Sequence, residues 1–282
     1  MNKVPDGSNM SKWILTRDAL TSAIDGLSDK TAVDVLFYPN KQTSAGNPNN
    51  VPRDVSACVN VNAMIPIGEL GTAGSTQRNM LDMGFSQAGP NGFTPTHDAY
   101  RYALLFGIES YQSMYGKFML IITDGTPTFS VNCEGTGNTN NPSPTQPIID
   151  EVAGALANGV RTFIIGSPGS EQGPNGVDER TWLSKAARAG GTATVGCSDT
   201  GPQFCHMDMS QAPDFGAALA AGLGQITGQI DACTYSIPAP PAGQTIDLGK
   251  VNLIISTASG NELVQPDNMG DCGEGWQLNS QG

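Results

Sequence analysis

One short segment constrains the fold of this chain more than any other. Residues 119 to 125 read Met-Leu-Ile-Ile-Thr-Asp-Gly, an apolar run that ends abruptly in a carboxylate and a glycine. A strand that is buried on both faces of a parallel sheet has this uninterrupted apolar character. In α/β proteins, the carboxyl edge of such a sheet is where ligands bind. We therefore expect Asp124 to lie at the carboxyl edge of a buried strand.

Strands and helices alternate along the rest of the chain. Strands are expected at residues 32–38, 59–67, 117–123, 160–165 and 193–196, the last continued around 204–207. Helices are expected at residues 13–24, 75–83, 95–111, 148–157, 179–189 and 215–230. This alternation predicts an α/β fold of the doubly wound type, with a mostly parallel central sheet flanked by helices.

The composition changes after residue 231. A proline-rich stretch at residues 236–241 is followed by one further expected strand at residues 251–256. We therefore expect two domains, a large α/β domain over residues 1–231 and a small β-rich extension over residues 232–282.

Charge and composition exclude several classes of partner. The net charge is −12 with only 14 Lys and Arg, so neither nucleic acid nor an anionic membrane surface is an expected partner. No apolar run approaches the roughly 20 residues of a membrane span. The 35 glycines and 19 prolines indicate long ordered loops, which are more typical of an exported protein than of a cytosolic enzyme.

The six cysteines favour disulfides over a zinc site. They are widely spaced and include no Cys-x-x-Cys pair. Six cysteines allow about 15 connectivities. If each cysteine pairs with its neighbour in the sequence, the disulfides are Cys58–Cys133, Cys197–Cys205 and Cys233–Cys272. Disulfides place the protein in an oxidising compartment: extracellular, periplasmic or at the cell surface. No signal peptide is visible, so we expect a mature form or a clipped start.

A second segment adds oxygen ligands to the predicted edge. Residues 92 to 96 read Gly-Phe-Thr-Pro-Thr, which places a hydroxyl and a helix-compatible proline directly before the helix expected at 95–111. This segment and Thr-Asp-Gly at residues 123–125 resemble, in the right order, two of the three segments that define the metal-ion-dependent adhesion site of the von Willebrand factor type A (VWA) domain. The first segment of that site, Asp-x-Ser-x-Ser, would begin at Asp6. The resemblance covers roughly residues 4 to 230, and the tail from Cys233 is similar to tails on bacterial secreted or lipid-anchored members.

The resemblance implies a metal site formed by Asp6, Ser8, Thr94 and Asp124. Oxygen ligands of this kind suit Mg²⁺ or Mn²⁺, with Ca²⁺ as a further possibility. In the family, an open position on the ion is filled by a carboxylate of the partner protein. The implied function is that of an extracellular protein-binding and adhesion module.

Two departures from the family pattern favour an alternative. Met10 stands where the second serine belongs, and a thioether is a poor ligand for a hard cation. Only five residues precede Asp6, and Pro5 among them cannot donate to a sheet ladder. Either the start of the chain has been lost, or the sheet lacks most of its central strand. The alternative is a structural or assembly subunit with a degenerate metal site, which self-assembles or is completed by strand addition from a partner.

An enzyme is not expected. The chain has two histidines, and no nucleophile–base pair is visible in the sequence. The segment at residues 166–170, Gly-Ser-Pro-Gly-Ser, misses the Gly-x-Ser-x-Gly spacing of a hydrolase elbow. His206 beside Cys205 is interpreted as a neighbour of a disulfide.

Overall fold

A computed structural model describes most of the chain, in two compact units, Met1–Cys233 and Thr234–Gly282. The domain boundary predicted from the change in composition lies after residue 231, close to this division. The described residues are 1, 3–38, 59, 64–89, 94–112, 116–127, 143–173, 177–231, 246–247, 250–257, 260–266 and 276.

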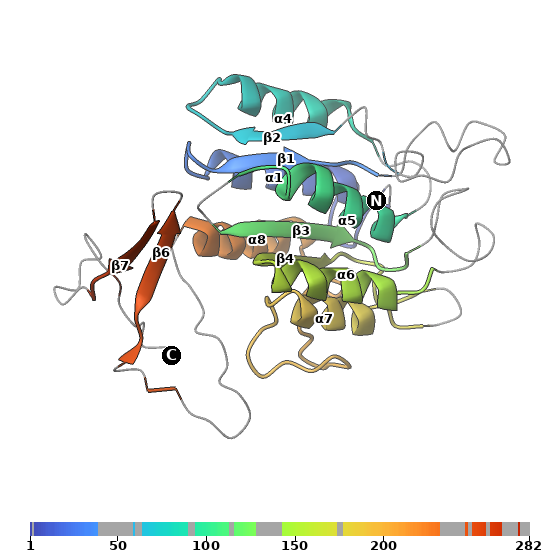
Figure 1. The fold of residues 1–282 in the computed structure, drawn as a ribbon. Coiled ribbons are helices and arrows are strands. Elements are labelled where there is room, and N and C mark those ends of the chain that lie inside the picture. Colours follow the sequence, from blue (N-terminus) through green and yellow to red (C-terminus); the bar gives the residue numbers. More distant parts are fainter. Residues whose placement is uncertain are drawn as a thin grey trace, which may run out of the picture. The chain divides into compact units, whose positions relative to one another are not determined.

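The first unit is a mixed α/β structure with two separate sheets (Figure 1). Its strands are β1 (Ala32–Val35), β2 (Ile65–Glu69), β3 (Lys117–Thr123), β4 (Val160–Gly166) and β5 (Met207–Asp208). Its helices are α1 (Lys12–Asp25), α4 (Thr76–Gln87), α5 (Thr96–Ala103), the π-helix η3 (Leu104–Ile108), α6 (Gln146–Ala157), α7 (Arg180–Ala189) and α8 (Phe215–Asp231). No helix in the described ranges has the length and apolar character that crossing a membrane requires.

The expected strand before Asp124 is confirmed. β3 covers Lys117–Thr123 and pairs in parallel with β4 along its whole length, from Lys117 opposite Val160 to Thr123 opposite Gly166. β4 in turn pairs in parallel with β5. The uninterrupted apolar runs of β3 and β4 form this sheet because helices cover both of its faces.

Local signals in the sequence set the helix starts. The Ser11 and Ser75 side chains accept hydrogen bonds from the backbone N–H groups of Ile14 and Arg78, and so cap α1 and α4. α5 begins directly after Pro95 and widens at Leu104 into the π-helix η3. The helix predicted over residues 95–111 is therefore two elements, and the second ends at Ile108.

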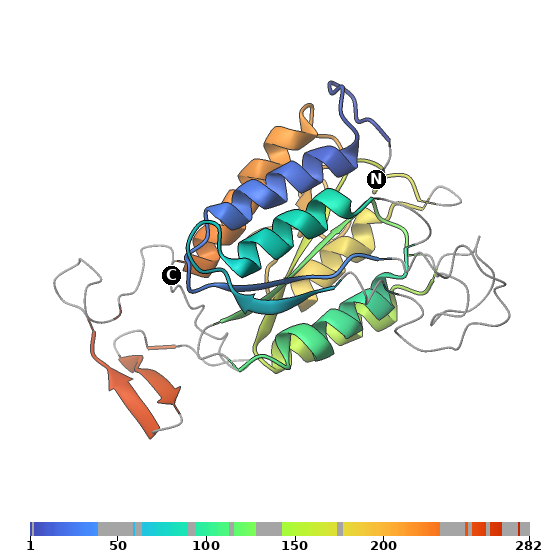
Figure 2. The same ribbon diagram turned by 90° about the horizontal axis from the view of Figure 1, so that it is seen from above.

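Successive side chains of β3 and β4 point to opposite faces of the sheet and so divide the core into two layers. Met119 and Ile121 pack with α5, α6 and α7, whereas Leu120 and Phe163 pack with α1 and α8. A third cluster joins β1 and β2 to α4 and the end of α1. Figure 2 shows α1 in blue beside α8 in orange on one side of the strands, with α5 and α6 together on the other.

The expected parallel sheet flanked by helices is present in part, as the three strands β3, β4 and β5. Among the described strands, β1 pairs with β2 in antiparallel orientation, and β3 pairs with β4 but not with β1. The helices flank both pieces as expected, but the described strands leave the facing edges of β1 and β3 unpaired with each other. The supported fold class is therefore mixed α/β, with a three-stranded parallel sheet and small antiparallel sheets.

The last strand of the parallel sheet was expected to begin at residues 193–196, and this is wrong. That segment is a loop with Gly196 at φ 76°, and β5 is confined to Met207–Asp208. A disulfide between Cys197 and Cys205 closes the loop, so these residues cannot extend along β4.

The second unit contains an antiparallel hairpin. β6 (Leu253–Thr257) pairs with β7 (Gly260–Val264), from Leu253 opposite Val264 to Thr257 opposite Gly260. The Trp276 indole N–H donates to the Val264 carbonyl at 3.0 Å. The predicted strand at residues 251–256 corresponds to β6.

Candidate functional site

Asp124 lies at the carboxyl edge of the parallel sheet, as predicted. It directly follows β3, and the Ser167 N–H after β4 donates to the Thr123 carbonyl at 2.9 Å, which holds the two strand ends together. Gly125 turns the chain at φ 120°, and a Cβ there would approach the Ser170 Cα and the Glu179 Cβ to 3.0 Å. Glycine is therefore required after Asp124 to turn the chain against the next loop.

Two ammonium groups of the chain itself contact the Asp124 carboxylate. The Met1 amino group lies 3.3 Å from Oδ2, and the Lys12 Nζ lies 3.2 Å from the same oxygen. Lys12 is only 3 % exposed and also donates to the Pro168 carbonyl at 2.7 Å. Burial by itself would raise the pKa of Asp124, but the two neighbouring positive charges outweigh it and lower that pKa. Asp124 is therefore a carboxylate whose charge is already neutralised.

Thr94 lines the same cavity as Asp124. Both residues line one cavity, together with Met1, Tyr38 and Thr96. Burial raises the pKa of Tyr38 to about 12, a hydrogen bond with Thr96 opposes this rise, and the negative charge of Asp124 adds to it. This end of the cavity thus combines the Asp124 carboxylate with the neutral hydroxyl groups of Tyr38, Thr94 and Thr96, and we call these residues the rim.

Asp6 and Ser8, the other two predicted ligands, do not share these contacts. Ser8 lies in a turn in which its Oγ accepts from the Met10 N–H at 3.0 Å, and Asp6 is exposed. Neither residue lines the cavity that Thr94 and Asp124 line. Among the described residues, no group of three or more His, Cys, Asp or Glu side chains could hold a metal ion.

This arrangement does not fit an ion bound by all four residues. Lys12 and the Met1 amino group take the place beside Asp124 that a cation would need, and repulsion between like charges would oppose a divalent ion there. The metal site of Asp6, Ser8, Thr94 and Asp124 stays a prediction.

Lys12 is a residue of this site that the sequence patterns did not predict. A signal was present, because Lys12 is the first residue of α1 and follows the Ser11 cap. A positive charge in the first turn is unfavourable to the helix dipole. A buried lysine at that position needs a specific anionic partner, and here the partner is Asp124.

The cavity itself extends between the two sheets. Its volume is about 1440 Å³, which exceeds the roughly 300–1,000 Å³ of typical small-molecule pockets. Residues of β1 and β3 line it along their whole length, and side chains of α1, α5 and α8 complete it. Most of these side chains are apolar, and Asp34 is an exception.

Asp34 is a buried carboxyl group beside η3. Its Oδ2 lies against Gly107 and has no hydrogen-bond partner in the described part of the chain. Burial raises its pKa to about 6, and a bond with its own backbone opposes this rise.

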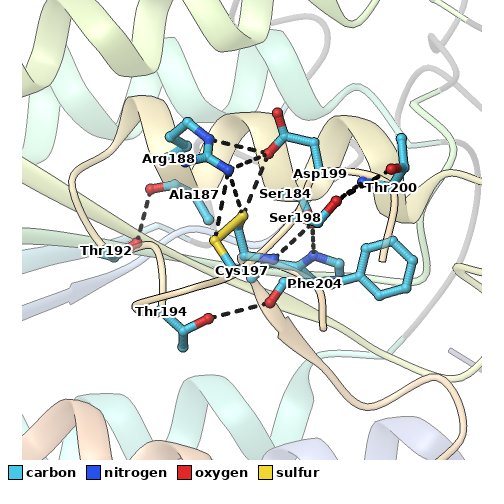
Figure 3. The surroundings of a disulfide bond; sticks show 12 residues. Ser184, Ala187, Arg188, Thr192, Thr194, Cys197, Ser198, Asp199, Thr200 and Phe204 are labelled. Carbon is cyan, nitrogen blue, oxygen red and sulfur yellow. Dashed lines mark hydrogen bonds and ion pairs between the residues drawn. A yellow bond between two sulfur atoms is a disulfide. The ribbon is translucent and has the colours of Figure 1, made fainter. Parts of the chain in front are cut away.

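A second polar network surrounds the disulfide between Cys197 and Cys205 (Figure 3). This bridge confirms one of the three predicted pairings, whereas Cys58, Cys133, Cys233 and Cys272 lie outside the described residues. Arg188 on α7 donates to the Asp199 carboxylate at 3.1 Å, and its guanidinium lies 3.0 Å from the Cys205 sulfur. The network fixes the loop between α7 and β5 to α7.

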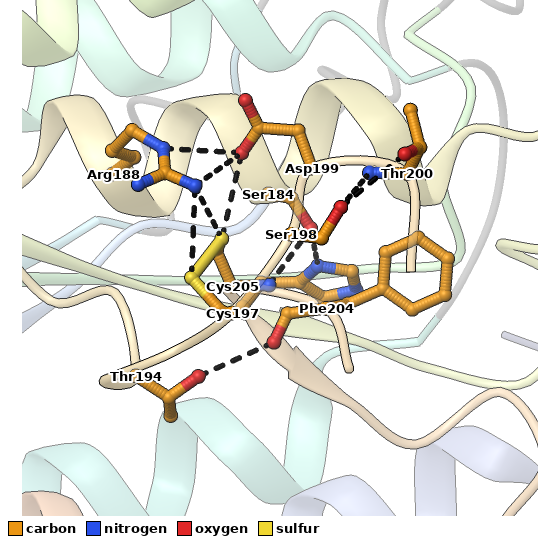
Figure 4. A network of polar contacts seen from close by, with 10 residues as sticks. Ser184, Arg188, Thr194, Cys197, Ser198, Asp199, Thr200, Phe204 and Cys205 are labelled. Carbon is orange, nitrogen blue, oxygen red and sulfur yellow. Dashed lines mark hydrogen bonds and ion pairs between the residues drawn. A yellow bond between two sulfur atoms is a disulfide. The ribbon is translucent and has the colours of Figure 1, made fainter. Parts of the chain in front are cut away.

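His206 is a structural residue of this network rather than an exposed base. Its Nδ1 lies 2.9 Å from the Ser184 Oγ, which also accepts from the Cys205 N–H at 3.0 Å (Figure 4). Both side chains are buried, and burial lowers the pKa of His206 to about 4. The pair therefore ties β5 to α7, as expected for a histidine beside a disulfide.

Comparisons with known proteins support the fold alone. No protein-family model and no curated protein matches the sequence. The structure resembles a crystal structure of the pilus adhesin SpaC from Lactobacillus rhamnosus GG, with a TM-score of 0.53 and 16% identity, over 79% of this chain and 28% of that chain. It also resembles the open conformation of SpaC, with a TM-score of 0.51 and 12% identity, over 89% of this chain and 34% of that one. This chain thus spans about a third of the adhesin.

Proposed function

We propose that this chain is a VWA-like protein-binding module of an exported adhesin, acting at the cell surface. The observation that carries the proposal is the rim at the carboxyl edge of β3, where Asp124 lines the same cavity as Thr94. Ligands of α/β sheets bind at this edge. The fold likeness to part of a pilus adhesin supports the same class of function.

Exported character has independent support. The Cys197–Cys205 disulfide requires an oxidising compartment in an ordinary mesophilic protein. The low content of charged residues, 14%, and the abundance of glycine and proline agree with this location.

In the metal-dependent form of the proposal, Asp6, Ser8, Thr94 and Asp124 hold Mg²⁺ or Mn²⁺, and the ion bridges to an acidic residue of a partner protein. Because Asp124 already contacts two ammonium groups, this metal-dependent form requires a rearrangement of the site. Lys12 and the Met1 amino group must move away from the carboxylate, and the turn that carries Asp6 and Ser8 must approach it.

An array of acidic peptides, probed with the purified protein with and without Mg²⁺ or Mn²⁺, tests the proposal. We expect peptide binding that Asp124→Ala reduces at least about tenfold, which corresponds to one charged contact of roughly 1.4 kcal/mol. Asp82→Ala is the matched control, because Asp82 is an exposed aspartate on α4.

The outcomes separate the forms of the proposal. Binding that needs the ion supports the metal-dependent form, and binding without the ion supports a rim that works through Lys12 and Asp124 alone. Binding that is equal for the wild type, Asp124→Ala and Asp82→Ala would show that the rim is not the binding surface.

A second candidate function is that of an assembly subunit completed by an added strand. The specific observation in its favour is the cavity between β1 and β3, which is lined by two strand edges that do not pair with each other.

A further inference from the structure

The disulfide between Cys197 and Cys205 joins two sulfur atoms in different surroundings. Cys205 is only 1% exposed. Cys197 is partly exposed, and two residues before it the Val195 side chain is 97% exposed. A thiol in solution can therefore reach the Cys197 sulfur more readily than the Cys205 sulfur.

A positive charge lies against the buried sulfur. The Arg188 Nη2 is 3.0 Å from the Cys205 Sγ and 3.7 Å from the Cys197 Sγ (Figure 4). Arg188 is in the last turn of α7, and Ser184, one turn earlier on the same helix, accepts from the Cys205 N–H at 3.0 Å. Helix α7 thus holds the backbone of Cys205 in place and presents the guanidinium to its sulfur.

A negative charge opposes this contact. The Asp199 Oδ1 lies 3.4 Å from the Cys205 Sγ and accepts from the Arg188 Nη2 at 3.1 Å. His206 adds no charge near neutral pH, because burial lowers its pKa to about 4. Of the charged side chains in the described part of the chain, Arg188 and Asp199 are therefore the two that contact the buried sulfur, and the guanidinium is the nearer.

These contacts bear on the exchange of the disulfide with a thiol. In that reaction a thiolate attacks one sulfur, a new S–S bond forms, and the other sulfur leaves as a thiolate. A positive charge nearby stabilises a thiolate and so favours its departure. Attack at Cys197 makes Cys205 the leaving group, and its thiolate forms directly against Arg188. Access and electrostatics thus favour the same direction of attack.

We propose that Cys197 is a site of reversible modification by low-molecular-weight thiols, with Arg188 as the group that stabilises the departing Cys205 thiolate. The sulfur of the small thiolate bonds to the Cys197 sulfur, the Cys197–Cys205 bond breaks, and its electron pair stays on Cys205. Attack of the Cys205 thiolate on the mixed disulfide reverses the exchange, so no further oxidant or reductant is needed. The inference goes beyond the proposed function and uses none of the rim residues.

Exchange of the protein with reduced glutathione near neutral pH tests the proposal. Acid quenches the reaction early, free thiols are alkylated, and peptide mass spectrometry assigns each modification to a single cysteine. We expect glutathione on Cys197 and the alkyl group on Cys205. A synthetic disulfide-closed peptide of residues 193–207 shows the preference of the same bond without α7, and we expect it to carry glutathione on both cysteines.

Two substitutions separate the electrostatic role of Arg188 from a structural one. Arg188→Gln and Asp199→Asn both break the ion pair that ties the loop to α7, so a purely structural role would change the exchange rate in the same direction in both variants. The proposal predicts opposite directions. We expect exchange at Cys197 to be roughly fivefold slower for Arg188→Gln and roughly twofold to fivefold faster for Asp199→Asn, the size of one partly exposed charge contact.

Arg161→Gln is the matched control. Arg161 is an arginine that donates to the Gly191 carbonyl at 2.8 Å, near the start of the same loop. We expect its exchange rate to equal that of the wild type.

Several results would overturn the proposal. Glutathione mainly on Cys205, or equally on both cysteines of the folded protein, would contradict the direction of attack. Changes of the same sign in Arg188→Gln and Asp199→Asn would show that the ion pair only braces the loop. No adduct on the protein under conditions that modify the synthetic peptide would show that the folded loop excludes thiols. The array of acidic peptides reports separately on the rim, so failure of one experiment does not imply failure of the other.

Discussion

At the scale of single residues, the most informative contact is that between Lys12 and Asp124. Lys12 is nearly inaccessible to solvent, whereas the Asp124 side chain is 38% exposed. A buried ammonium group depends on its partner more than an exposed carboxylate does, because it has lost more hydration. Lys12 therefore acts as a built-in cation at the position where the sequence predicts a metal ion.

Replacement of Lys12 with methionine tests this role. We expect Lys12→Met to lower the free energy of unfolding by about 1–2 kcal/mol, a value reduced for the exposure of Asp124 and for the remaining Met1 amino group. Urea denaturation measures the change. Added Mg²⁺ should stabilise the variant more than the wild type. Lys30→Met is the control, because Lys30 is 79% exposed and should lose under about 0.5 kcal/mol.

Two buried groups, Asp34 and His206, give opposite dependences of stability on pH. Asp34 has a pKa of about 6 in the folded protein against an ordinary value of 3.8, so the folded state binds more protons between these values and stability falls as pH rises through them. His206 has a pKa of about 4 against 6.5, so the unfolded state binds more protons and stability rises over nearly the same range. Each effect is worth about 3 kcal/mol at most.

Single substitutions should separate these two effects. Relative to the wild type, Asp34→Asn should become progressively more stable as pH rises from about 4 to 6, by up to about 3 kcal/mol. His206→Gln should become progressively less stable relative to the wild type over the same range. Denaturation by urea at several pH values measures both differences. Parallel curves for the wild type and both variants would contradict the assignment.

At the scale of elements, Arg78 joins α4 to the end of α1. Its guanidinium donates to the carbonyl groups of Ile24, Leu27 and Gly71 and to the Asp29 carboxylate, at 3.0 to 3.2 Å. The side chain is 9% exposed. Because the Ile24 and Leu27 carbonyls lie at the C-terminal end of α1, where intrahelical donors run out, the arginine supplies a charged donor to backbone groups there.

Removal of this guanidinium should therefore be costly. We expect Arg78→Ala to lower the free energy of unfolding by about 3 kcal/mol, because several buried carbonyls lose a charged donor. Thermal and urea denaturation measure the loss. Arg17→Ala is the matched control, since Arg17 pairs with Asp18 at the surface and should lose about 0.5 kcal/mol. Equal losses would show that α4 is held by its apolar contacts alone.

The elements also show how far the sequence predicts the fold. The limits of β3 were predicted correctly, because its central apolar run lies between Gly116 and Asp124, two residues that favour turns. The helix at residues 95–111 was predicted as continuous, since apolar periodicity does not distinguish the π-helix η3, which packs against β2 and β3, from a further turn of α-helix. The strand at 193–196 was predicted from β propensity alone, and the disulfide loop overrode that propensity.

At the scale of the whole molecule, the first unit is organised around a cavity that separates two sheets. α1 spans this division, because Leu20 packs both with the β3–β4 core and with the β1–β2 core. A strand added in the cavity would connect the two cores directly.

The sequence by itself determined the alternation of strands and helices and the strand that ends at Asp124. These features depend on local patterns of apolar residues, turns and charge, which are read along the chain. Only the tertiary structure decided that Lys12 lies beside Asp124. It also decided that Thr94, but neither Asp6 nor Ser8, lines the same cavity as Asp124, and that the described strands form two separate sheets in the first unit. These features depend on which distant segments meet, and no local pattern encodes the packing that brings them together.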